Sequence, residues 1–396
     1  MITSTSNAQM KNLVQLQKKG KARREQDVFV AEGLKMYREA PRELVEKIYL
    51  SETFSKKEEA REILRRRNVE IETDAGITGY GEGSPGPLIT GENLPGTVET
   101  LRVFREKLIG MDPRDIEGIN AVMNRAVAYA GTAKAAVDIA CHDILGKAAG
   151  LPLYKLLGGL SNTIETDMTV GIDTPELMAA AAKEHVAAGF RVIKTKVGTN
   201  IADDIARVKA IREAVGDDVK IRLDANQGWH AREAVELLKR LNEYDIELVE
   251  QPVRRFDFEG LKYVTANSPV PVMADESCWD SKDALRLVSE RAVDFINIKL
   301  MKCGGLWEAK KIVNIAEAAG VEIMLGCMAE ESGIAINAAA ALGAALGNIT
   351  RADLDASFSL KALPYEGGFT IENTKDLVLS ENPGLGLVRL KEEMFQ

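Results

Sequence analysis

The sequence predicts an α/β protein whose main body is a modified (β/α) barrel of the TIM type, preceded by a cap domain and a short N-terminal segment. From residue 165 onward, short β-branched runs alternate with amphipathic segments of about 15 residues. Eight such runs follow one another, as a closed parallel barrel requires. An open doubly wound sheet is the alternative, but no Gly-rich dinucleotide turn follows the first run.

The predicted strands are short and end in polar or charged residues. They are Thr166–Val170, Val192–Val197, Val219–Leu223, Ile246–Val249, Val272–Ala274, Phe295–Ile298, Glu322–Leu325 and Ile349–Leu354. Because the carboxyl ends of barrel strands meet at one mouth, their terminal side chains should face a common pocket.

The remaining segments divide the chain into further parts. We expect a cap at residues 71–160, the barrel at 161–356 and a return to the cap at 357–396, with 1–70 as a separate segment. An alternating pattern at 69–73 followed by Asp74–Gly79 predicts a hairpin. Alanine-rich helical patterns run from about residue 97 to residue 149.

Composition indicates a cytoplasmic globular protein. Of 396 residues, 45% are apolar and 28% charged. No apolar run is long enough to span a membrane, and Met1–Met10 lacks the apolar core of a secretory signal. The four cysteines form no Cys-x-x-Cys pair, which disfavours a zinc site or a disulfide framework.

Three carboxylates end three consecutive predicted strands: Asp224, Glu250 and Asp275. Like charges brought together repel one another unless a cation joins them. Oxygen ligands without His or Cys suit Mg²⁺, or Mn²⁺, better than zinc. The sequence therefore predicts a magnesium site at the barrel mouth.

Two lysines, Lys196 and Lys299, end the second and sixth predicted strands, on opposite sides of the barrel. A lysine beside Lys194 and a divalent cation should have a lowered pKa and act as a base. Two such lysines facing one α-carbon can remove a proton from one face and return it to the other. A single charged strand end is usually a capping or solvated residue, but the ordered set favours an active site.

These motifs resemble the enolase superfamily, in its muconate lactonizing branch, over residues 70–390. The resemblance implies an α+β cap and a magnesium-dependent reaction with lysine bases on an enediolate. We also expect a homo-oligomer. The matching segments are Lys194–Lys196, Leu223–Asn226, Val249–Pro252, Ala274–Ser277, Asn297–Lys299, Asp138–Lys147 and Leu156–Gly159.

Asp353 and Asp355 on the last strand resemble the pair with which dipeptide epimerases hold the α-ammonium group of the substrate. A spacing of two puts both carboxylates on one face of a strand, where they can bind one cation. The predicted substrate contacts are these two residues with Lys194, Thr169 and Glu330. Rival functions with the same metal and lysines are a muconate-type cycloisomerase, an N-acylamino acid racemase and an o-succinylbenzoate synthase.

Residues 1–70 carry 16 Lys and Arg against 11 Asp and Glu, unlike the acidic remainder. Ile2–Asn7, Lys11–Val14, Arg23-Arg24 and Phe29–Gly33 resemble the N-terminal substrate-binding domain of SpoU-type RNA ribose 2′-O-methyltransferases. The cap pattern is therefore incomplete at its start, and we interpret the chain as a fusion of two unrelated parts. A non-catalytic RNA-binding protein is the rival reading from another class.

Overall fold

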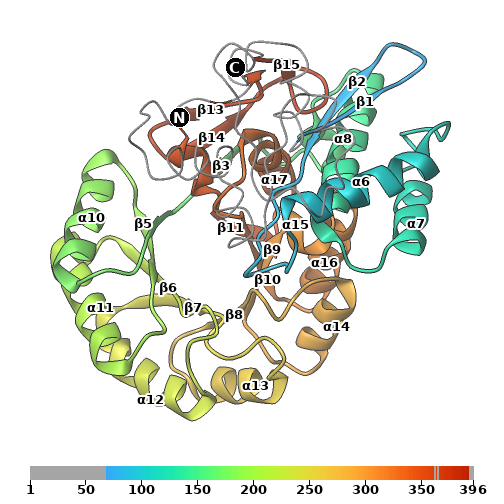
Figure 1. Ribbon diagram of the computed structural model, residues 1–396. Helices are drawn as coiled ribbons and strands as arrows, with labels where there is room; N and C mark the ends of the chain where they lie inside the picture. Colours follow the sequence, from blue (N-terminus) through green and yellow to red (C-terminus); the bar gives the residue numbers. More distant parts are fainter. Residues whose placement is uncertain (1–67, 361–362, 364, 392–396) are drawn as a thin grey trace, which may run out of the picture. The chain divides into compact units, whose positions relative to one another are not determined.

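A computed structural model describes residues 68–360, 363 and 365–391 (Figure 1). They belong to one of the two units into which the chain divides, Lys56–Gln396. The predicted SpoU-like segment, residues 1–70, lies almost entirely outside the described residues. Its fold, its RNA binding and the fusion that it implies stay predictions.

Eight parallel strands form the barrel, and each begins and ends within two residues of its predicted position (Figure 1). Helices alternate with them and lie around their outside. The strands are β4 (Met168–Val170), β5 (Val192–Lys196), β6 (Lys220–Asp224), β7 (Ile246–Glu250), β8 (Val272–Ala274), β9 (Phe295–Lys299), β10 (Glu322–Gly326) and β11 (Ile349–Asp353). The helices are α10 (Pro175–Ala188), α11 (Ile201–Val215), α12 (Ala231–Leu241), α13 (Phe258–Asn267), α14 (Ser281–Ser289), α15 (Leu300–Cys303), α16 (Leu306–Ala318) and α17 (Gly333–Ala345), with the 3-10 turns η3 (Asn242–Tyr244) and η4 (Asp355–Ser359). The predicted TIM-type barrel is confirmed.

The barrel is nearly closed, with a seam between β4 and β11. The strand order runs from β11 through β10 to β4, and no ladder of paired residues joins β4 to β11 in the described part of the chain. Individual bonds span the seam instead: Asp167 N donates to Ala352 O at 3.1 Å, and Leu354 N donates to the Thr166 hydroxyl at 2.7 Å.

Local sequence determines where the barrel helices begin and end. Helix α10 starts after Thr174, whose hydroxyl accepts a hydrogen bond from Leu177 N, with Pro175 in the first turn. It ends at Gly189, whose φ of 126° favours glycine. The apolar faces of the helices pack on the β-branched strand residues and form one continuous core.

The cap begins with the predicted hairpin, β1 (Asn68–Glu72) and β2 (Thr78–Glu82), which pair antiparallel. Its helices are α6 (Leu94–Leu108), α7 (Ile116–Ala126), α8 (Gly131–Ala149) and the short α9 (Leu153–Leu157). Strand β2 lies so close to α8 that a Cβ on Gly81 would lie within 2 Å of the carbonyl oxygen of Ala136. Only glycine permits this approach.

The C-terminal segment returns to the start of the barrel and to the cap. Its strands are β12 (Tyr365–Gly367), β13 (Phe369–Glu372), β14 (Asp376–Leu379) and β15 (Leu387–Leu390), and β14 also pairs with β3 (Thr163–Glu165). Buried Asp143 of α8 accepts hydrogen bonds from Tyr80 N of the hairpin and Leu385 N of the tail. One carboxylate therefore joins three segments far apart in sequence. Among the described residues, no helix has the length and apolarity needed to cross a bilayer.

Candidate active site

Strand register places the predicted catalytic residues in one layer at the carboxyl ends of the strands. Lys196 of β5, Asp224 of β6 and Glu250 of β7 are paired neighbours in the sheet. Lys299 of β9 and Asp353 of β11 flank Gly326 of β10 in the same way. A Cβ on Gly326 would lie 2.6 Å from Asn297 Oδ1 and 3.0 Å from Lys299 Cε, so glycine leaves room for the Lys299 side chain.

Lysine ammonium groups join the carboxylates of this strand-end layer. Lys194 Nζ lies 3.1 Å from Asp224 Oδ2, 2.7 Å from Glu250 Oε2 and 2.6 Å from Asp353 Oδ2, and its side chain is 1% exposed. Lys196 Nζ lies 2.6 Å from Asp224 Oδ2 and is 28% exposed. Lys299 Nζ lies 2.9 Å from Asp275 Oδ2. Lys196 is the most accessible of the three lysines, and Lys194 lies deepest.

The surrounding charges set the protonation of the layer. Burial and the neighbouring Asp224 and Asp275 charges raise the pKa of Glu250 to about 8. Burial alone would lower the pKa of Lys299, but Asp275 and Glu250 outweigh it and raise that pKa above its usual range. The pKa of Lys194 is raised in the same way, by the charges of Asp224, Asp353 and Glu250. The sequence predicted a lowered pKa for Lys299. The protein groups alone raise it instead, because the facing carboxylates favour the ammonium form.

The three predicted metal ligands fit a divalent cation by their chemistry. All are buried oxygen donors, and Glu250 Oε2 and Asp275 Oδ2 accept no hydrogen bond from any described residue although a lysine lies near each. In their present positions, no three His, Cys, Asp or Glu side chains of the described residues form a group that could hold a metal ion. The lysines lie between the carboxylates, so cation binding requires the carboxylates to exchange lysine contacts for the ion.

Asp353 and Asp355 converge on Thr169 across the seam. Thr169 N donates to Asp355 Oδ2 at 2.8 Å, and its hydroxyl donates to Asp353 Oδ1 at 3.3 Å. Asp355 does not lie on the strand as expected, because β11 ends at Asp353 and Asp355 begins the turn η4. Burial and Asp353 raise the pKa of Asp355, whereas Lys194 outweighs burial and lowers that of Asp353. The pKa of Asp353 is thus the lower of the two.

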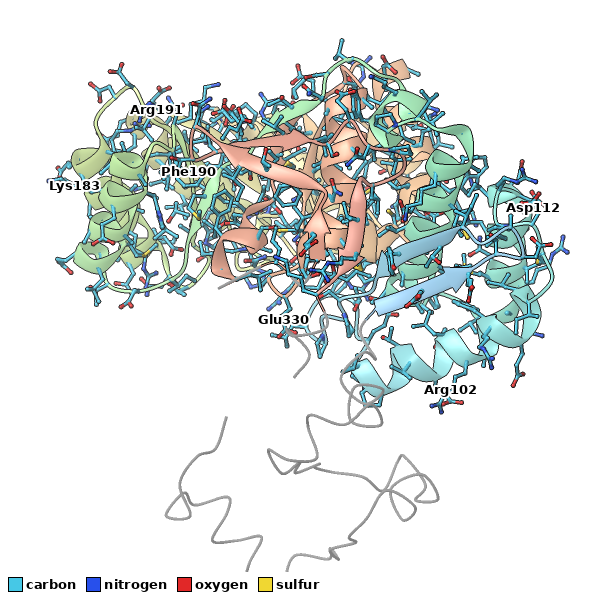
Figure 2. All side chains as sticks on the ribbon, turned by 90° about the horizontal axis from the view of Figure 1, so that it is seen from above. Arg102, Asp112, Lys183, Phe190, Arg191 and Glu330 are labelled. Atoms are coloured by element: carbon cyan, nitrogen blue, oxygen red, sulfur yellow. The ribbon has the colours of Figure 1, made fainter. Side chains whose placement is uncertain are left out.

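Glu330 lies apart from the buried layer. It is exposed, and Figure 2 shows its side chain at the edge of the described residues. The next residue, Glu331, is buried and accepts a hydrogen bond from Met328 N at 2.9 Å. The role predicted for Glu330 stays a prediction, and the buried acidic group of this loop is Glu331.

Sequence reasoning assigned no role to several other groups around the layer. The Asn297 amide donates to Glu250 Oε1 at 2.8 Å, and Lys302 contacts Asp275 on the side away from Lys299. Buried Glu276 follows Asp275 and accepts from the Asn226 amide at 3.4 Å. The signal for Asn297 was available, because it lies two residues before Lys299 and faces the same side of β9.

Glu331 gives a stability prediction with a definite sign. Burial and the nearby Glu82 raise its pKa to about 8 in the folded protein, against about 4.3 when unfolded. Folding therefore takes up a proton, and stability falls as pH rises from about 4.3 to about 8. Glu331→Gln should leave the stability of the metal-free protein unchanged near pH 4 and raise it by about 3 kcal/mol near pH 7. Urea unfolding at both pH values measures this, and a variant less stable than wild type near pH 7 would contradict it.

Fold and site together define a class of protein: a barrel enzyme with buried carboxylates and lysines at the carboxyl ends of its strands. Two family models match the chain. Residues 63–158 match the N-terminal domain of mandelate racemase / muconate lactonizing enzyme, and residues 177–393 match the enolase C-terminal domain-like family. The chain belongs to the mandelate racemase / muconate lactonizing enzyme family of the enolase superfamily.

Relatives within this family are similar over most of their length. The chain is 56% identical over 341 residues to the hydrophobic dipeptide epimerase of Enterococcus faecalis, covering 86% of this chain and 96% of the relative. It is 44% identical over 324 residues to the L-Ala-D/L-Glu epimerase of Clostridium acetobutylicum, covering 81% and 89%. The crystal structure of the dipeptide epimerase from E. faecalis with Mg and L-Leu-L-Tyr matches with a TM-score of 0.80 and 57% identity, over 81% of this chain and 91% of that one.

Proposed function

We propose that this protein is a dipeptide epimerase that exchanges the α-proton of the C-terminal residue of its substrate between Lys196 and Lys299. The observation that carries the proposal is the position of these lysines on β5 and β9, the second and sixth of eight strands, which face one another across the barrel mouth. The curated relatives support the substrate class, since they act on dipeptides.

The amino end of the dipeptide would bind at Asp353 and Asp355. A charge-assisted hydrogen bond from the α-ammonium group to the ionised Asp353 orients the substrate along β11. The C-terminal α-carbon would then lie between the two lysines. Lys194 stays the predicted contact for the substrate carboxylate, although its contacts to Asp224, Glu250 and Asp353 must first loosen.

The predicted cofactor is Mg²⁺, with Mn²⁺ as an alternative, held by Asp224, Glu250 and Asp275. When bound, the ion supplies positive charge beside the substrate carboxylate. One lysine removes the α-proton and the other returns a proton to the opposite face, so the configuration inverts. The deep position of Lys299 keeps bulk water away from its proton.

Metal-dependent exchange of the α-proton tests the proposal. The protein with Mg²⁺ should incorporate one deuterium at the C-terminal α-carbon of an L,L-dipeptide in D₂O, as measured by mass spectrometry. EDTA should lower the rate by at least about 10³-fold, and Mn²⁺ should restore it. Folded protein that binds Mg²⁺ but labels no dipeptide would contradict the substrate class.

The partners and location that go with this function are proposals too. A homo-oligomer and a cytoplasmic location are expected from the sequence. RNA binding by residues 1–70 stays a separate prediction, which a salt-dependent RNA gel shift that disappears on deleting those residues would support.

A further inference from the structure

Arg222 is a buried cation that the proposed reaction does not use. It lies on β6 below Asp224 and is 5% exposed. The interior of a (β/α) barrel is usually filled with apolar branched side chains, and the neighbouring interior residues Leu248, Met273 and Met324 follow that rule. A buried ion pair seldom adds stability over apolar residues of the same size, so a charged group here requires another explanation.

The guanidinium of Arg222 reaches across the barrel interior to the seam. Its Nη1 donates to Asp167 Oδ2 at 2.7 Å and contacts Ala352 O at 3.4 Å, while Nε donates to Glu247 Oε2 at 2.6 Å. Asp167 is 1% exposed and its own N–H donates to the same Ala352 carbonyl. Arg222 and Asp167 thus hold the peptide group that immediately precedes Asp353.

The seam needs such support because little else fixes it. No ladder pairs β4 with β11 in the described residues, so Asp353 is not positioned by continuous sheet bonding on that side. A cavity of about 420 Å³ lies at the amino ends of the strands, and Asp167, Arg222 and Ala352 are among its lining residues. Packing from below is therefore incomplete, and directional hydrogen bonds take its place.

We propose that Arg222 and Asp167 are positioning residues that orient the Ala352–Asp353 peptide so that Asp353 faces the α-ammonium group of the substrate. This inference rests on the proposed function, because it assigns the two residues to the recognition of the amino end. They act through Asp353 and touch neither the substrate nor the two lysines.

Arg222→Lys is the sharpest variant, because it keeps the charge but loses the planar fork that spans Asp167, Glu247 and Ala352. With L-Leu-L-Tyr and saturating Mg²⁺, KM for α-deuterium exchange should rise about tenfold or more, with kcat within about twofold of wild type. Arg207→Lys is the matched control: Arg207 is a similarly buried arginine of α11 that bonds Asp204, Thr199 and the Asp173 carbonyl. None of these is a proposed substrate or metal contact, so the substitution should leave KM unchanged. In an Asp353→Asn background, Arg222→Lys should have no further effect on KM.

Two results would overturn the inference while leaving the proposed function intact. Arg222→Lys could lower the melting temperature and leave KM unchanged, or its effect could add fully to that of Asp353→Asn. Arg222→Met separates geometry from charge: a raised KM supports positioning, whereas a lowered KM would mean that only the removed positive charge matters, which overturns the inference.

If Arg222→Lys does not fold, Thr166→Val is the alternative variant. It removes the acceptor for Leu354 N and should raise KM in the same way. If wild type labels no dipeptide, the proposed function fails, and the inference fails with it.

Discussion

Replacing Lys299 with Met is expected to lower the rate of interconversion of dipeptide epimers by at least about 10³-fold, while α-proton exchange of one epimer continues. Replacing Lys196 with Met should leave exchange of the opposite epimer only. The reason is geometric: β5 and β9 lie on opposite sides of the mouth, so each lysine reaches one face of the α-carbon. Proton NMR in D₂O with each pure epimer measures both rates.

Lys209→Met is the matched control for these two substitutions. Lys209 is an exposed lysine of α11 whose one ion pair within the described part of the chain is weak, at 3.8 Å to Glu213. Its loss should change neither rate. A Lys196 or Lys299 variant that still interconverts epimers within about tenfold of wild type would contradict a two-lysine mechanism. Loss of exchange on both faces in both variants would mean that the lysines do not act on separate faces.

Replacing Asp353 and Asp355 together with Asn should raise KM for free dipeptides by at least about 100-fold, because each charge-assisted hydrogen bond to the ammonium group contributes about 1.5–3 kcal/mol. N-acetylated dipeptides lack that positive charge, so their turnover should not fall. Steady-state kinetics with both substrate types provide the measurement.

This pair of substrates also separates the rival functions. An N-acylamino acid racemase would prefer the acetylated substrate already as wild type, and a cycloisomerase or an o-succinylbenzoate synthase would exchange neither. Thr169→Val is a useful companion, because it removes the hydroxyl that bonds Asp353 and keeps the backbone N–H that bonds Asp355. Full dipeptide activity in the double Asn variant would refute the assignment of these carboxylates.

Much of the fold could be predicted because strand and helix patterns alternate regularly from residue 165 onward. The strand-end layer could be predicted for the same reason: a residue at the carboxyl end of a barrel strand has only one mouth to face. Lys196, Asp224, Glu250, Lys299 and Asp353 lie together for this reason alone. No knowledge of loop conformation was required.

Loop and register details could not be predicted in this way. The acidic pair Glu330 and Glu331 follows β10 in an irregular loop, where no period indicates which side chain turns inward. The register shift between Ile221 and Arg222 is equally invisible, because a bulge depends on the neighbouring strand. The raised pKa of Lys299 depends on how many carboxylates face it, and only three-dimensional distances reveal that number.

The seam beside β11 has an evolutionary consequence. Asp353 ends a strand joined to β4 by a few separate bonds, and Asp355 begins the turn after it. The strands that carry the two lysines, in contrast, pair with a neighbouring strand on both sides. Substitutions in β11 and η4 can therefore alter which amino-terminal group is accepted while the proton-transfer apparatus stays in place. Descendants of one ancestral gene would then diverge in substrate by changing this strand first, and libraries for directed evolution of new specificities should begin at residues 351–357.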